Sequence, residues 1–489
     1  MSTRSIVTVS SSIRKGNIIV ASEPFDRQAA DVILRTSDNV HFYVYKTILL
    51  TSSTFFKTMF SSCTWKAETY HGYHPIIDVP EDSSTLEYLL RFCYPGHSPM
   101  ITNLVQLDLL LEAAFKYDIS TAAEPLREAL QLSVYQNPLR VFAIACRHKL
   151  EEEADLAALT WKKQSFLDDT AQDFSRTCAG ASYVSEMAQT SAGAYYRLLS
   201  YLRTARGNAR FQLYEPRPSE TSPPTAESPQ PWSSSSPSHS PFNRADADVV
   251  LRSSDNVDFR VHTMILSMAG GENLFLSQTV QDTTIDGIPV LLTHTDSHVL
   301  AELLRMCYPP SIANSRIQSH VFHTFKGVFD AATTYGMTAV VNIMRSILKR
   351  AVREHPLSVY LVAVTCGWIE EARVALELLV FEPIHELYVT ELEGVSADIY
   401  HRLLKQHHQL QFTLLKTLEP SVRYSSRSDT PSAANVPWKD TWLTVYDGIS
   451  DTEVGRRRDS HLMDMVKRRR EIQVMLRDAV SNVCTSESI

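Results

Sequence analysis

Apolar and polar positions alternate most clearly within residues 31–49. An apolar run at 32–34 is followed by the polar turn Ser37-Asp38-Asn39 and then by a stretch with a period of two. This pattern predicts a β-hairpin with one buried face. The face expected to be buried holds Val40, Phe42 and Val44, and the face expected to meet solvent holds His41, Tyr43 and Tyr45.

The same pattern returns at residues 248–266. Its apolar positions are Val257, Phe259 and Val261, and the opposite positions are Asp258, Arg260 and His262. Further matched segments follow in the same order: 89–95 with 303–309, 113–114 with 331–332, 138–139 with 356–357, 152–154 with 370–372, and 195–199 with 400–404. One module of about 200 residues is therefore written twice, and we refer to a first and a second repeat.

After the hairpin, the first repeat changes to helical spacing. A short helix is expected over 46–50, and Ser53 or Thr54 is placed to cap the next one. Residues 76–79 predict a third strand. Ser84 and Glu87 form a capping-box pattern ahead of another helix. Two more helices are expected over 104–117 and 121–136, and helical patterns continue from Pro138 and again from Pro356, to about 206 and 418.

Three segments lack a sustained apolar pattern or stand apart from the repeats. Residues 1–24 are expected to be mostly disordered, with a short strand at Ile18-Ile19-Val20. Residues 215–242 hold eight prolines and nine serines and predict a spacer. Residues 459–482 form a basic amphipathic stripe, which is a bipartite nuclear-import signal, a helix that binds an acidic partner, or a solvated helix. We favour the solvated helix.

Composition narrows the function classes. With 44% apolar and 21% charged residues the chain is globular in type, and its net charge of −8 argues against nucleic-acid binding. No apolar run reaches membrane-spanning length, and the amino terminus has no secretory pattern. We therefore expect no membrane association and a cytoplasmic or nuclear location, or both.

Residues with reactive side chains form no catalytic or metal-binding pattern. The seven cysteines lack zinc-site spacing, and Cys93 and Cys307 are expected to be buried as small apolar groups. The histidine pairs are interpreted as surface imidazoles and the acidic run as solvent-exposed charge; these are His71 with His74, His294 with His298, His407 with His408, and Glu151-Glu152-Glu153. No phosphate loop or nucleophile motif appears. We expect no enzyme activity and no cofactor.

A set of motifs occurs in a characteristic order in the first repeat: Asp31, Tyr45-Lys46-Thr47-Ile48-Leu49, Phe55-Phe56, the strand at 76–79 and Tyr94-Pro95-Gly96. In these motifs the first repeat resembles a BTB/POZ domain. The resemblance implies an α+β fold in which a small three-stranded sheet caps a cluster of helices, used for association between proteins. The chain resembles in particular fungal tandem-BTB proteins with BACK-like helical extensions, and the resemblance covers residues 25–132 well and about 244–350 less well.

The second repeat departs from that pattern. Thr263 stands where the family has lysine, as Tyr45 stands for its histidine in the first repeat, and Gly270-Gly271 weaken a forming helix by roughly 1 kcal/mol each. The expected organisation is a disordered start (1–24), BTB/POZ domain 1 (25–132), BACK-like region 1 (133–208), linker (209–243), a degenerate BTB/POZ domain 2 (244–350), BACK-like region 2 (351–418) and a mostly disordered tail (419–489).

The resemblance also implies an acidic and a basic residue at the floor of a dimer groove, here Asp31 and Lys46. A buried or half-buried charge is unfavourable unless it is paired. The two residues form either a partner-binding pocket or an ion pair between strand and helix, and we favour the ion pair. In the second repeat Asp248 faces Thr263, so we expect His262 to serve as its donor.

Two functions are compatible with this organisation. The first is a protein-interaction scaffold whose BTB domains associate with other BTB domains in cis or in trans. The alternative is a substrate adaptor of a cullin-3 ubiquitin ligase. The resemblance implies a hydrophobic-x-Glu element for such adaptors, whereas Trp65 and Glu68 are one residue too far apart.

Overall fold

The computed structural model describes residues 13–15, 18–62, 69–96, 99–167, 183–203, 211–213, 242–271, 284–308, 321–380, 382–422, 474 and 478. The chain divides into two compact units. Unit 1 comprises Met1–Gln172, Ser182–Thr190 and Tyr201–Glu215, and unit 2 comprises Asp173–Ala181, Ser191–Ser200 and Pro216–Ile489. The short segment Ser191–Ser200 therefore belongs to the first repeat by sequence and to unit 2 in space.

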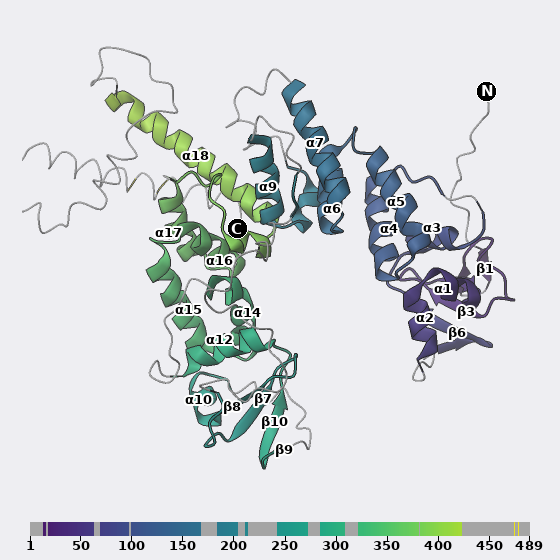
Figure 1. Ribbon diagram of the computed structural model, residues 1–489, viewed down its shortest axis with the longest axis horizontal. Helices are drawn as coiled ribbons and strands as arrows, with labels where there is room; N and C mark the ends of the chain where they lie inside the picture. The colour runs from purple at the N-terminus through teal and green to yellow at the C-terminus, as the bar shows by residue number, and fades with distance from the viewer. Residues whose placement is uncertain are drawn as a thin grey trace, which may run out of the picture. The chain divides into compact units, whose positions relative to one another are not determined.

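Unit 1 is a small sheet followed by helices. Its strands are β1 (Ile13–Lys15), β2 (Ile18–Val20), β3 (Val32–Arg35), β4 (Val40–Val44), β5 (Thr69–His71) and β6 (His74–Asp78). Its helices are α1 (Lys46–Ser52), α2 (Thr54–Ser61), α3 (Ser83–Cys93), α4 (Leu104–Lys116), α5 (Ser120–Leu132), α6 (Pro138–Arg147), α7 (Glu151–Leu167) and the short 3-10 helix η2 (Ser185–Gln189). Within this unit, α1 and α2 lie beside the sheet, and α6 and α7 continue beyond α4 and α5 (Figure 1).

The predicted hairpin forms β3 and β4, with Val32 opposite Val44. Asn39 makes the turn with a φ of 61°, a left-handed conformation that asparagine adopts more readily than most residues. The predicted third strand is β6, which pairs with β3 in parallel. The strand order is β1-β2-β4-β3-β6-β5, so the three expected strands form the centre of a wider sheet. The expected short strand at residues 18–20 is β2.

The second face of β4 is buried, so the prediction that it meets solvent is wrong. His41 and Tyr43 are each only 4% exposed. Strand β2 pairs with β4, and a separate apolar cluster forms on Tyr43. Its members are Val20, Ala30, Ile33, Tyr43 and Ile76, with Tyr45 packed against them. Alternation in the sequence shows which residues share a face, but not that an earlier segment covers that face.

Helix α3 begins differently from the prediction. Asp82, and not Ser84, is the N-cap, because its carboxylate accepts the backbone N–H of Thr85 at 2.7 Å. Glu87 forms an ion pair with Arg91 one turn later, at 2.6 Å. Aspartate caps a helix as well as serine does, and its charge also suits the positive end of the helix.

Unit 2 repeats this order of elements. Its strands are β7 (Val249–Arg252), β8 (Asp258–Val261), β9 (Thr284–Ile285) and β10 (Ile288–Leu292). Its helices are α10 (Thr263–Met268), α12 (Ser297–Cys307), α14 (Val321–Thr334), α15 (Thr338–Ala351), α16 (Pro356–Thr365), α17 (Ile369–Leu379), η3 (Thr390–Gly394) and α18 (Ala397–Val422), and residues 192–200 of α9 (Ala192–Arg203) join them.

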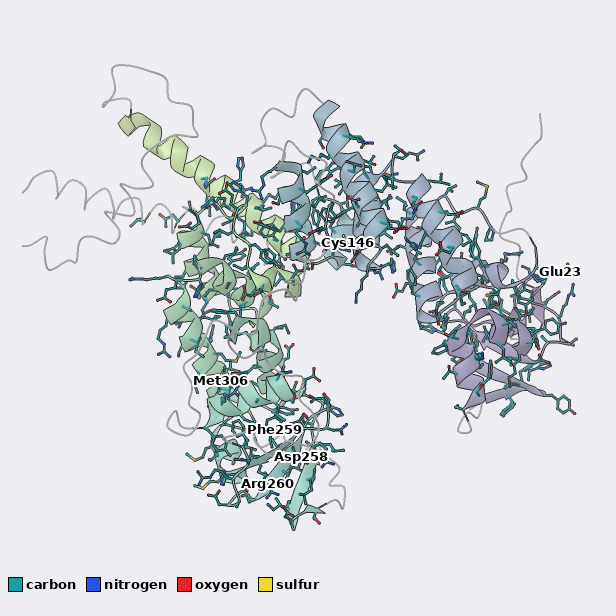
Figure 2. All side chains as sticks on the ribbon, viewed as in Figure 1. Glu23, Cys146, Asp258, Phe259, Arg260 and Met306 are labelled. Carbon is teal, nitrogen blue, oxygen red and sulfur yellow. The ribbon has the colours of Figure 1, made fainter. Side chains whose placement is uncertain are left out.

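The second sheet confirms the doubled hairpin. Strands β7 and β8 are antiparallel with Val249 opposite Val261, β10 lies parallel to β7, and the order is β8-β7-β10-β9. Phe259 and Val261 are buried as predicted, at 2% and 0% exposed, while Asp258 and Arg260, the neighbours of Phe259 on β8 (Figure 2), are half-buried. Val257, which was expected on the buried face, is half-buried as well. Gly270, with a φ of 92°, and Gly271 follow the end of α10, and the helix that they were expected to weaken falls largely outside the described residues.

Three predictions lie largely or wholly outside the described residues. Only Phe242 of the proline-rich linker is described, and only Val474 and Asp478 of the basic amphipathic segment. The stretch that contains Trp65 and Glu68 lies outside as well. The spacer, the import signal and the hydrophobic-x-Glu element therefore stay predictions.

Candidate protein-interaction surfaces

The first predicted site lies where β3 leads to α1. The carboxylate of Asp31 accepts the backbone N–H of Lys46 at 3.0 Å, and the Lys46 ammonium lies 4.6 Å from the centroid of the Phe60 ring. Asp31 is exposed, so its charge is not buried as the resemblance implied. The described bond is a helix-capping interaction, which stabilises the first turn of α1.

The equivalent site in the second repeat has a different donor from the one expected. Asp248 accepts the backbone N–H of Thr263 at 2.7 Å and also the Thr263 hydroxyl. Burial by itself would raise the pKa of Asp248, but these hydrogen bonds lower it, and the net pKa lies below the usual value. His262 instead contacts the Tyr308 hydroxyl, with its backbone N–H at 2.9 Å and its Nδ1 at 3.0 Å. Asp248 is exposed like Asp31.

An aromatic pair that the sequence reasoning missed lies behind each of these caps. Phe25 is fully buried, with its ring centroid 5.1 Å from that of Tyr94, and Phe242 lies 5.4 Å from Tyr308 in the same way. The Tyr94 hydroxyl accepts the N–H of Tyr45 at 3.1 Å. The available signal was spacing, because each phenylalanine precedes its capping aspartate, 31 or 248, by the same interval.

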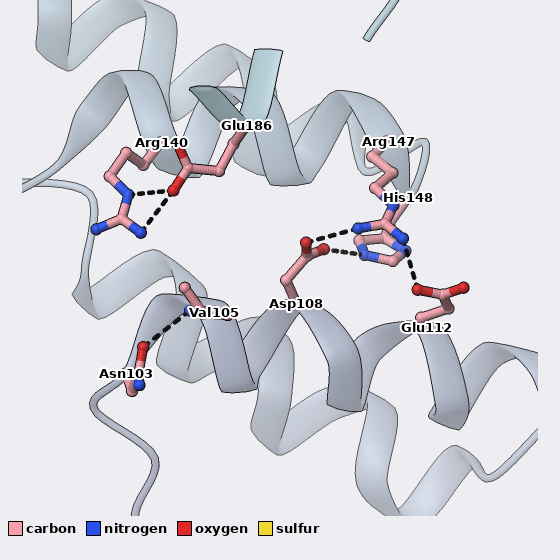
Figure 3. A network of polar contacts seen from close by, with 8 residues as sticks. All are labelled: Asn103, Val105, Asp108, Glu112, Arg140, Arg147, His148 and Glu186. Carbon is pink, nitrogen blue, oxygen red and sulfur yellow. Dashed lines mark hydrogen bonds and ion pairs between the residues drawn. The ribbon is translucent and has the colours of Figure 1, made fainter. Parts of the chain in front are cut away.

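Charged side chains join α4 of the first repeat to its extension (Figure 3). One oxygen of Asp108 accepts a hydrogen bond from Arg147 at 2.7 Å, and the other lies 2.7 Å from Nε2 of His148. Arg147 also donates to Glu112 at 2.5 Å. Arg147 and His148 lie at the end of α6, whereas the two carboxylates lie on α4, so oriented, charge-assisted hydrogen bonds hold the α4–α6 contact.

A buried acid joins α5 to α7, and the prediction that this acidic run is solvent-exposed is wrong for it. Glu153 is 0% exposed and accepts from Arg127 at 2.8 Å and from Gln131 at 3.1 Å. The second repeat has the same arrangement, with Glu371 beside Arg345 at 3.2 Å and Lys349 at 3.7 Å. A buried carboxylate persists only when it is paired, and both repeats supply the pair.

At the same junction of the second repeat, aromatic side chains stand where the first repeat has the buried residues Leu107, Leu111 and Leu150. Trp368 is 7% exposed, with ring centroids 6.0 Å from Phe325 and 5.2 Å from Phe329, both on α14. The Arg345 guanidinium lies 5.5 Å from the Trp368 ring. Lys326, at the position equivalent to Asp108, forms an ion pair with Asp330 on its own helix.

A pair of methionines is exposed on α10. Met264 and Met268 are 72% and 77% exposed and stand four residues apart, so they share one face of the helix. The equivalent exposed positions on α1 are Thr47 and Thr51. The same helix therefore presents apolar groups in the second repeat and hydroxyl groups in the first.

One histidine prediction is wrong. His294 and His298 are exposed as expected, but His407 is 6% exposed, and its Nε2 lies 3.0 Å from the carbonyl oxygens of Leu379 and Glu382. Burial lowers the pKa of His407 to about 4. The described residues contain no group of three or more His, Cys, Asp or Glu arranged to hold a metal ion.

The described cysteines are free thiols. They are Cys93, Cys146, Cys307 and Cys366. Burial raises the pKa of the Cys307 and Cys366 thiols to about 12 and also raises that of Cys93. These three thiols are therefore protonated and unreactive near neutral pH.

Comparison with known protein families identifies the repeated domain. The family profile described as BTB/POZ domain matches residues 22–133 and 240–351. These two segments are BTB/POZ domains. Both matches begin early enough to include Phe25 and Phe242, and both end before α6 and α16. The BACK-like character of the two helical extensions therefore stays a prediction.

No curated protein matches the chain. None of the helices in the described part of the chain is long and apolar enough to cross a membrane. BTB/POZ domains are protein-interaction modules that mediate association and dimerisation, so the surfaces of domains 1 and 2 are where partners are to be sought.

Proposed function

We propose that this chain is a protein-interaction scaffold whose two BTB/POZ domains bind partner proteins through different surfaces, in the cytoplasm or the nucleus. The partners in this proposal include other BTB domains, in the same chain or in another. The presence of two BTB/POZ domains in one chain supports the proposal. Each domain offers a separate binding surface, and a single chain can therefore bring the partners of both domains together.

The methionine pair of domain 2 is the observation that carries the proposal. Met264 and Met268 add nothing to the core of the domain, because most of each side chain lies in solvent. Thioether side chains are flexible and polarisable, and they suit surfaces that adapt to a partner. Two of them on consecutive turns of α10 form an apolar face that is stabilised when a partner covers it.

Domain 1 exposes different groups. Tyr70 on β5 is 61% exposed, and Tyr73 in the turn before β6 is 99% exposed. The corresponding turn of domain 2 holds Asp286 and Gly287. Tyrosine is common at protein interfaces because it combines an apolar ring with a hydroxyl that forms hydrogen bonds.

The test compares two surface variants of the full chain as bait. The first, Met264→Thr with Met268→Thr, gives domain 2 the residues of domain 1; the second, Tyr70→Thr with Tyr73→Thr, removes the exposed rings. Each is expected to reduce recovery of its own set of proteins roughly tenfold, as measured by quantitative mass spectrometry, and to leave the other set unchanged. Identical recoveries for the unmodified chain and both variants would contradict the proposal.

Self-association is measured on the same proteins by light scattering. A mass that falls from dimer to monomer in the methionine variant would identify a second copy of this chain as the occupant of that face. The amount of cullin-3 recovered with the unmodified chain is measured in the same mass-spectrometry experiment. Its stoichiometric recovery would make the scaffold an adaptor of a ubiquitin ligase.

A further inference from the structure

Residues 191–200 pack within unit 2 against the equivalent part of the second repeat. Ser191 and Ser396, which occupy the same position in the two repeats, form an antiparallel β-bridge. The backbone N–H of Ala192 donates to the carbonyl of Val395 at 2.7 Å. A residue paired with its own counterpart marks the axis of a local twofold relation.

Aromatic contacts follow the same relation. The rings of Tyr195 and Tyr400, again equivalent residues, meet edge to face with centroids 6.2 Å apart. Tyr195 lies 6.1 Å from His401, and the counterpart contact, Tyr196 with Tyr400, is 6.2 Å. This reciprocity is typical of an interface between two identical subunits, although here both sides come from one chain.

The charges break the symmetry. Glu393 accepts hydrogen bonds from Arg197, from the Ser191 hydroxyl at 3.2 Å and from the Tyr388 hydroxyl at 2.8 Å. The position equivalent to Glu393 in the first repeat is Ala188, which has no carboxylate. The carboxylate that holds Arg197 therefore exists in the second repeat only.

Glycine provides the space for that carboxylate. A Cβ atom at Gly193 would collide with the side chain of Glu393. The equivalent residue of the second repeat is Asp398, which forms an ion pair with Arg402 on its own helix at 3.1 Å. The two equivalent arginines thus have different partners, Arg402 within its helix and Arg197 across the contact.

We propose that this contact is selective: residues 191–200 recognise the η3–α18 segment of the same chain, and neither side pairs well with another copy of itself. Two first-repeat helices would set each Arg197, whose side chain is 14% exposed, against Ala188. Two second-repeat helices would place Asp398 where Gly193 now lies, against Glu393, so two carboxylates would overlap. The inference goes beyond the proposed scaffold role and does not require any external partner.

Cysteine pairs introduced at the axis test this selectivity in the full chain. Residues paired across an antiparallel bridge have the Cα separation that a disulfide needs. Ser191→Cys with Ser396→Cys is expected to give a 191–396 disulfide within single chains, identified by peptide mapping against the unmodified chain. Ser191→Cys alone and Ser396→Cys alone are expected to give no symmetric dimer.

Substitutions of the charged residues then test whether the Arg197–Glu393 interaction causes the selectivity. In the double-cysteine chain, Arg197→Met is expected to slow disulfide formation roughly tenfold, whereas Arg402→Met, its matched control, leaves the rate within about twofold. Glu393→Arg slows it as well, and combining Glu393→Arg with Arg197→Glu restores it. The restored double exchange excludes misfolding as the cause of the single defects.

Three results would overturn the proposal. They are a 191–396 disulfide found only between chains, symmetric dimers of either single-cysteine chain as abundant as the 191–396 product, or equal effects of Arg197→Met and Arg402→Met. The first would mean exchange between copies, and the others would mean that the two sides are interchangeable.

Discussion

In the first repeat, Asp108 on α4 holds Arg147 and His148 at the end of α6, whereas in the second repeat Trp368 packs against Phe325 and Phe329 on α14. Both contacts join a BTB/POZ domain to the helices that follow it. The order of helices is the same in both places. The first repeat has charged groups beside the buried residues Leu107, Leu111 and Leu150, whereas the second has aromatic rings at the equivalents of these leucines.

The difference shows which interaction the shared architecture requires. The ion pair between α5 and α7 occurs in both repeats, as Arg127 with Glu153 and as Arg345 with Glu371. The contact next to it differs, because Lys326 stands where the first repeat has Asp108 and aromatic rings stand where it has leucines. We infer that the buried acid constrains the packing of the extension, while the neighbouring contact is free to change as long as it fills the same space.

The largest predicted effect concerns the buried acid. Arg127→Met leaves Glu153 with the neutral Gln131, whereas Arg345→Met leaves Glu371 with the cation Lys349. We expect the first variant to destabilise α7 by roughly 3 to 5 kcal/mol and the second to destabilise α17 by about half as much. Hydrogen exchange of the amides in α5, α7, α15 and α17 measures both.

Adding Gln131→Lys to Arg127→Met supplies the missing cation and is expected to recover part of the loss. Equal destabilisation by the two arginine variants, with no recovery, would contradict the importance of the second cation.

The next effect is the pH dependence that His407 contributes to the stability of the second repeat. The pKa of His407 is lowered by burial from 6.5 to about 4. Above pH 6.5 the group is neutral in both states. As the pH falls from 6.5 to 4, the unfolded chain binds a proton that the folded chain does not, so the free energy of unfolding falls, by up to roughly 3 kcal/mol.

The matched variant is His407→Leu, because Leu202 stands at the equivalent position of the first repeat. The free energy of unfolding of the unmodified chain minus that of this variant should decrease as the pH is lowered from 6.5 to 4. A constant difference would show that His407 titrates normally in the folded protein.

A smaller effect separates the two junctions by salt. Asp108→Asn keeps the shape of the side chain but removes its charge, and we expect it to destabilise the α4–α6 contact by about 1 to 2 kcal/mol. Raising the ionic strength should weaken this contact in the unmodified chain and leave the Trp368 packing unchanged. Amide exchange in α6 and α16 at low and high salt compares them directly.

The smallest effect concerns the turn after α6. Lys149 adopts a φ of 59°, and the equivalent residue of the second repeat is Gly367, with a φ of 72°. Lys149→Gly should stabilise the first repeat by about 0.5 to 1 kcal/mol, since glycine adopts this conformation without strain. The reverse change, Gly367→Lys, should destabilise the second repeat, and thermal unfolding of both variants tests the pair.

Local patterns were sufficient to predict much of the fold. The alternating residues gave both hairpins, and Ser53 caps α2 as expected, accepting the N–H of Phe56 at 3.1 Å. Pro138 and Pro356 begin α6 and α16 as predicted. Each of these features depends on residues that are close together in the sequence, so the sequence alone contains the necessary information.

The surfaces and the buried charges could not be predicted in the same way. Glu153 and His407 look like solvent-facing residues on helices, and only the arrival of Arg127, or of the carbonyls of Leu379 and Glu382, makes their burial favourable. The Met264–Met268 face is the reverse case. From the sequence, these apolar helix residues would be assigned to the core, but both are exposed. Such assignments depend on contacts between segments far apart in the chain.

The ring of Phe242 extends the second domain upstream of its first strand. It packs against Phe259 and Tyr308, and its carbonyl accepts the N–H of Arg260 at 2.8 Å. A polypeptide that starts after this residue would expose both rings and lose a backbone bond to the sheet. The smallest second BTB/POZ domain that folds alone is therefore expected to start at or before Phe242, and a protease that cuts just downstream of Phe242 would release a fragment prone to aggregate.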